Sequence, residues 1–116
     1  MSKPYRNKKI GEYIREEMVC CITSKPNPVN HHIIGYGYSG TATKAPDFLQ
    51  AALCHELHTE LHDKGWKAFE AKHGVTQKQL VAQTMWAVHS AGVINLNELD
   101  APAWLFEELE EAQWNM

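Results

Sequence analysis

The chain has 116 residues, of which 44% are hydrophobic and 22% charged, so we expect one folded domain spanning residues 1–116. No apolar run is long enough for a membrane span, and the polar start is unlike a secretory signal. Three cysteines are too few for a disulfide scaffold, which predicts a reducing, cytoplasmic location. The formal net charge of −3 divides unevenly, because residues 1–97 carry +3 and residues 98–116 carry −6.

The first part of the chain predicts a helix followed by two short strands. Apolar residues recur at helical spacing over residues 10–19, after a loose basic start. Two β-like segments, residues 19–23 and 29–35, flank the turn-forming sequence Lys25-Pro26-Asn27-Pro28 and predict a hairpin. A glycine-rich loop, residues 35–40, follows it.

The rest of the chain predicts helices. The first begins at Pro46 or Asp47 and runs to Gly65, because leucine and alanine recur there at spacings of three and four. The others are expected over residues 66–73, 77–92 and 102–114, and Thr76 with Gln79 forms a capping-box pattern before the second of these. This order of elements predicts a small α+β domain with additional helices at both ends.

Four of the seven histidines fall into two spaced pairs. His31 and His32 are adjacent on an expected strand, so their side chains should point to opposite faces. His58 and His62 are four apart on an expected helix, so both rings project from one face at chelating distance. Such pairs also arise by chance in a chain this rich in histidine, and hydrogen-bonded or solvated histidines are the alternative interpretation.

The order of these motifs resembles the HNH endonucleases (the ββα-metal or His-Me finger family) in their His-His variant, as in colicin DNase domains. In that family a His-His strand precedes a loop, a second strand and a helix with His-x3-His. Within residues 18–75, the amino-acid sequence most resembles the phage and prophage recombination-enhancement nucleases. The matching residues are Asn30-His31-His32-Ile33-Ile34, Gly40, Lys44-Ala45-Pro46-Asp47, Leu53-Cys54, His58, Leu61-His62, Gly65 and His73-Gly74.

The resemblance implies a largely sequence-nonspecific, metal-dependent DNA endonuclease. It makes His31, His58 and His62 the ligands of one divalent ion (Mg, Mn, Zn or Ni), and His32 the general base. Asp47 stands where these enzymes usually have an asparagine that orients the base; its alternative is a helix N-cap. Family members often add a structural zinc held by two Cys-x-x-Cys pairs. Here only Cys20 and Cys54 remain, so we expect no structural zinc but a metal-free, packed pair.

Two further surfaces are assigned from the sequence. Lys44, Tyr36, Tyr38 and Lys64 lie where they would contact a DNA strand beside the metal, with a plain solvent-exposed turn as the alternative for the loop. The acidic C-terminal helix carries an apolar stripe (Trp104, Leu105, Leu109) that either packs on the body or docks a protein partner or a second copy.

The HNH-like core would then span residues 18–75 and a helical extension residues 76–116. The alternative function is an inactive DNA- or protein-binding module with the metal as a structural staple.

Overall fold

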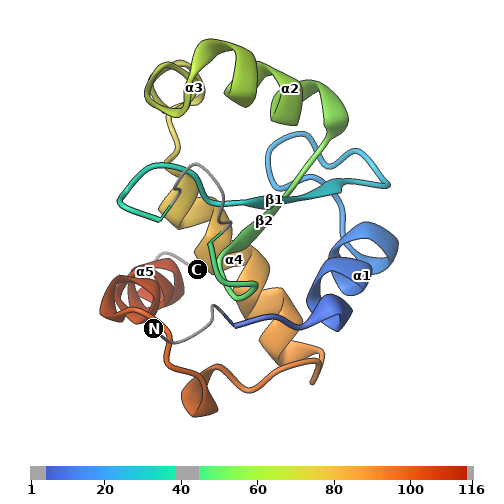
Figure 1. The fold of residues 1–116 in the computed structure, drawn as a ribbon, viewed down its shortest axis with the longest axis vertical. Coiled ribbons are helices and arrows are strands. Elements are labelled where there is room, and N and C mark those ends of the chain that lie inside the picture. Colours follow the sequence, from blue (N-terminus) through green and yellow to red (C-terminus); the bar gives the residue numbers. More distant parts are fainter. Residues whose placement is uncertain (1–4, 39–44, 115–116) are drawn as a thin grey trace.

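A computed structural model describes residues 5–38 and 45–114 as a mixed α+β fold. Within these residues, helices surround a two-stranded antiparallel sheet (Figure 1). The elements are α1 (Lys8–Glu17), β1 (Val29–His32), β2 (Gln50–Leu53), α2 (His55–Lys64), α3 (Trp66–His73), α4 (Gln77–Ser90), the 3-10 turn η1 (Leu96–Glu98) and α5 (Ala103–Trp114). None of the described helices is long and apolar enough to cross a membrane.

The sheet corrects two sequence predictions. β1 pairs with β2, with Val29 opposite Leu53 and His32 opposite Gln50, so the expected helix from Pro46 or Asp47 to Gly65 is wrong in its first part. All four residues of β2 are buried. A fully buried strand shows no alternation of polar and apolar residues, and its run of alanine and leucine fits a buried helix equally well.

The expected strand over residues 19–23 is also absent. That segment makes one isolated bridge, Val19 to Pro26, and turns through Ser24 and Asn27, whose φ angles of 63° and 55° are left-handed. Its Cys21 N–H donates to the Ala52 carbonyl oxygen at 3.0 Å, so the segment abuts β2 without extending the sheet. His31 and His32 therefore lie on the first strand of a strand–loop–strand–helix unit, not on the second strand of a hairpin.

Helix α4 lies at the centre of the core. The predicted capping box is present, with Thr76 and Gln79 each accepting the other's backbone N–H. Along the helix the buried residues are Gln77, Leu80, Val81, Ala82, Thr84, Met85 and Val88. The Thr84 hydroxyl accepts the Ala52 N–H at 3.2 Å, which gives the buried backbone of β2 a partner from the helix.

Helix α5 packs against α4 and buries its apolar stripe within the chain. Leu105 is fully buried and Leu109 is 9% exposed. Trp104 is partly buried, and its Nε1–H donates to the Tyr38 hydroxyl at 2.7 Å. Packing on the body, one of the two alternatives drawn from the sequence, accounts for the stripe.

Gly35 allows the chain to turn directly beneath an aromatic ring. Its φ is +78°, and a Cβ placed there would lie 2.4 Å from the Trp66 ring. Gly37 has a similar φ of +82° but no atom within 4 Å of that position.

We expect Gly35→Ala to destabilise the fold more than Gly37→Ala. Both variants bear the cost of a left-handed conformation, roughly 1–2 kcal/mol, and Gly35→Ala adds overpacking of roughly 1–3 kcal/mol. Urea unfolding followed by tryptophan fluorescence measures both. Equal losses would contradict the close contact with Trp66.

Candidate metal centre

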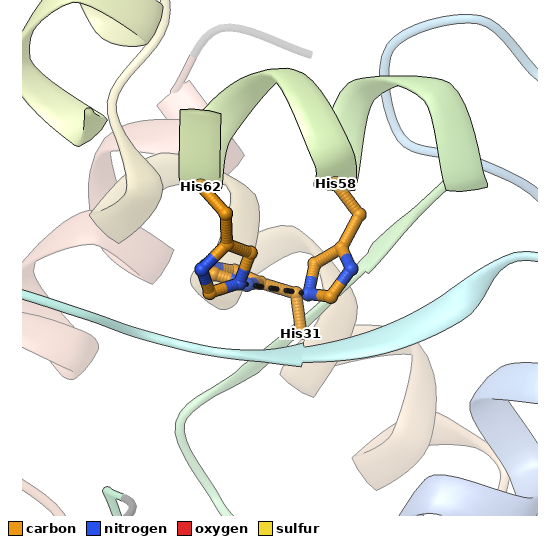
Figure 2. A group of neighbouring side chains, drawn as sticks. All are labelled: His31, His58 and His62. Atoms are coloured by element: carbon orange, nitrogen blue, oxygen red, sulfur yellow. Dashed lines mark hydrogen bonds between the residues drawn. The ribbon is translucent and has the colours of Figure 1, made fainter. Parts of the chain in front are cut away.

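Three histidine side chains converge between β1 and α2. His58 and His62 project from one face of α2 towards β1, from which His31 rises to meet them (Figure 2). One nitrogen of each ring lies within 4.8 Å of the others. Among the described residues this is the one group of three or more His, Cys, Asp or Glu side chains with that property.

The separation on α2 fits chelation. Nε2 of His58 and Nε2 of His62 are 3.1 Å apart. Two nitrogens bound tetrahedrally to one zinc at ~2.0–2.1 Å would lie about 3.3 Å apart. The i, i+4 spacing therefore presents the pair close to the geometry that a single ion needs.

Burial favours the neutral form of two of the three histidines, as metal ligation requires. His31 is 1% exposed, and burial is the main cause that lowers its pKa to about 4. Burial, followed by the neighbouring His62, also lowers the pKa of His58. Neutral imidazoles offer lone pairs to a cation, whereas protonated ones would repel it.

Gln77 fixes which nitrogen of His31 is available. Its amide is oriented by Ile34, since Oε1 accepts the Ile34 N–H at 3.1 Å and Nε2 donates to the Ile34 carbonyl oxygen at 2.8 Å. The same Oε1 lies 2.8 Å from His31 Nε2, so that nitrogen must be the donor. In the neutral ring the lone pair is then on Nδ1, and Gln77 holds the imidazole in the tautomer that can bind a metal through Nδ1.

The role of Gln77 was not anticipated from the sequence, because a glutamine in the first turn of a capped helix is ordinary. Its backbone N–H donates to Glu70 Oε2 at 2.8 Å, and the Tyr36 hydroxyl donates to the same oxygen at 2.6 Å. The orientation of His31 is thus connected to α3 and to the glycine-rich loop.

On the other side of β1, His32 pairs with Asp47. His32 Nε2 lies 2.8 Å from Asp47 Oδ1. Asp47 is 9% exposed and also accepts the Arg6 guanidinium at 3.2 Å and the Asn7 backbone N–H at 2.8 Å. Asp47 is not a helix N-cap, because a turn and then β2 follow it directly. The role of Arg6 was not anticipated from the sequence.

The four residues expected to contact DNA differ in burial, and one of them is not described by the structure. Lys44 lies outside the described residues, and Lys64 is exposed at the end of α2. Tyr36 and Tyr38 are partly buried and bonded to Glu70 and to Trp104. Burial and the Glu70 carboxylate raise the pKa of Tyr36, which keeps it a neutral donor. The two tyrosines therefore tie residues 36–38 to α3 and α5, while Gly37 between them is exposed.

Cys20 and Cys54 are both buried in the main core. Cys20 Sγ accepts the Thr23 N–H at 3.4 Å. Thr23 and Leu57, at the positions of the missing partners, have no thiol to offer a metal.

Comparison with known proteins places the chain in a family without assigning an activity. Residues 1–92 match the model of the family described as a protein of unknown function, DUF968. The chain belongs to this family. It is also 34% identical over 99 residues to the uncharacterized protein YdfU of Escherichia coli K12, an alignment that covers 81% of this chain and 27% of YdfU. The chain thus spans about a quarter of that relative's length, and no solved structure matches it.

Metal binding should require His31, His58 and His62 but not His32. Titration calorimetry with Zn²⁺ or Ni²⁺ on the four alanine variants measures this, since each ligand variant removes one of three nitrogens while His32→Ala leaves all three. Undiminished affinity in His58→Ala or His62→Ala would rule out the site.

Gln77→Met should weaken metal affinity by about 10–100-fold, because the His31 tautomer loses its hydrogen-bond partner. Gln77→Glu keeps an acceptor and should retain more of the affinity. Gln83→Met, at an exposed position of the same helix, serves as the matched control. Equal affinity of Gln77→Met and the control, in folded protein, would contradict the assignment.

Proposed function

We propose that the chain is a metal-dependent endonuclease that hydrolyses DNA phosphodiesters with little sequence preference. The observation that carries the proposal is that strand β1 contributes a histidine to each of two groups. His31 faces His58 and His62, and His32 is paired to the carboxylate of Asp47. The strand–loop–strand–helix order of the elements supports the HNH resemblance. Membership of a family of unknown function is neutral towards it.

The residues divide the chemistry between them. His31, His58 and His62 would hold a divalent ion, and the bound ion would supply positive charge for a phosphate oxygen and for the leaving oxyanion. Among the four candidate metals, zinc and nickel suit imidazole ligands, whereas magnesium and manganese prefer oxygen ligands. The cleavage assay below compares all four.

His32 acts as the general base. A carboxylate is an acceptor only, so His32 Nε2 carries the proton that bonds to Asp47 Oδ1, and Nδ1 is left to take a proton from the attacking water. Asp47 fixes the ring and stabilises the imidazolium that forms. The hydroxide attacks phosphorus and the bond to the leaving oxygen breaks. That oxygen takes a proton from solvent water, and His32 returns its proton to solvent.

A second candidate is a binding module in which the metal is a staple between β1 and α2. The nearly complete burial of His31, 1% exposed, is compatible with it, because a buried ligand suits a structural ion as well as a catalytic one. This module would bind metal and gain stability, yet His32 would have no role.

Plasmid cleavage separates the two. With Mg²⁺, Mn²⁺, Zn²⁺ or Ni²⁺ supplied in turn, we expect cleavage by the wild type and a loss of about 10²–10⁴-fold in His32→Ala, which retains its metal. His55→Ala, at the exposed start of α2, is the matched control and should cut normally. Cleavage by His32→Ala at the wild-type rate would overturn the mechanism. Metal-induced stabilisation without cleavage would favour the staple.

A further inference from the structure

A second concave site lies on the face of β1 turned away from the metal centre. It is a pocket of about 270 Å³ between α1 and the sheet. His32 and Asn30 enter it from β1, as expected for residues two apart on a strand. Basic side chains enter it from the other side, namely Arg6, Lys8 and Arg15.

The pocket has an excess of positive charge. Asp47 is the one acid among its lining residues, and it is already engaged by Arg6 and His32. Within the part of the chain that the structure describes, neither Lys8 nor Arg15 forms an ion pair with a carboxylate. The first turn of α1 contains no acidic residue, so the positive end of the helix dipole adds to the same field.

The Arg15 guanidinium is held in place by a chain of hydrogen bonds. Its Nη1 donates to Asn30 Oδ1 at 2.8 Å, and Asn30 Nδ2 donates to Gln50 Oε1 at 2.8 Å. Gln50, 1% exposed, donates in turn to the Asp47 carbonyl oxygen at 2.8 Å. These neutral partners orient the guanidinium without cancelling its charge.

Gly11 makes room for this arrangement. A Cβ at this position would lie 3.0 Å from Arg15 Nη1 and 3.2 Å from Asn30 Nδ2. A methyl group there would require the Arg15 or Asn30 side chain to shift slightly. Glycine at this position therefore leaves these two side chains room to meet.

We propose that this pocket binds a phosphate group of the nucleic-acid strand, near the phosphate that reacts. A planar guanidinium and an ammonium are the groups that proteins use for phosphate oxygens. Apart from His32 the lining has no aromatic ring on which a base could stack, so the contact reads the backbone and not the sequence. The inference rests on the proposed function for its substrate, but the binding itself needs no metal.

The test measures DNA binding in EDTA, where cleavage cannot occur. The anisotropy of a short labelled duplex gives Kd between about 50 and 200 mM salt for the wild type, Arg15→Gln and Lys8→Gln, both exposed positions. Each variant should bind roughly five- to tenfold more weakly at low salt, and the slope of log K against log salt should fall by about 0.9. Lys67→Gln on α3 removes an equal charge elsewhere and should leave the slope unchanged.

Inorganic phosphate tests the pocket without DNA. In ¹⁵N NMR titrations it should shift the amide signals of residues 7–15 and the side-chain amide of Asn30 saturably, and the Lys8→Gln/Arg15→Gln double variant should lose the response. Circular dichroism checks that each variant is folded.

The proposal would be overturned if the wild type does not bind DNA in EDTA, or if the pocket variants bind DNA with the same affinity and salt dependence as Lys67→Gln. Weaker binding by the pocket variants without metal-dependent cleavage would keep the pocket and reject the nuclease.

Discussion

The alternation of side chains along β1 is the constraint on which the whole site depends. Neighbouring strand residues point to opposite faces, so His31 meets α2 while His32 meets Asp47 and the basic pocket. Pairing with β2 fixes this assignment, because a slip of one residue would exchange the two faces. The small Ala51 stands opposite His31, whereas Gln50 stands opposite His32 and joins the polar network there.

The helical extension takes part in the site and is not an appendage to it. Gln77 is 46 positions from His31 and lies beyond residues 18–75, to which the HNH resemblance extends. The Thr76–Gln79 capping box fixes the start of α4, and Gln77 is the first residue of that helix. The capping box therefore sets the position of Gln77. A local signal readable in the sequence therefore positions a buried amide that selects the tautomer of a distant histidine.

Residue spacing predicted the parts of the site that depend on local geometry. The i, i+4 histidines of α2 and the adjacent pair on β1 have fixed directions within their own elements, and the α+β class follows from the same patterns. The strand over Gln50–Leu53 was not predictable in this way, because alanine favours a helix by local propensity. The segment becomes a strand through its burial against β1 and α4. Gln77 and Arg6 are brought in by tertiary packing alone.

Charge is distributed unevenly over the molecule. Helix α5, which carries the acidic residues, lies on one side of α4, and α1 lies on the other side (Figure 1). Helix α1 contributes to the lining of the basic pocket. Within the described residues β1 has one strand partner, which leaves its second edge without a ladder. A nucleic-acid strand that crosses this edge would meet the histidine cluster on one face and the arginines on the other. Repulsion by α5 disfavours the opposite approach. On the proposed function, this distribution of charge would guide the nucleic-acid backbone to the strand that carries both histidines.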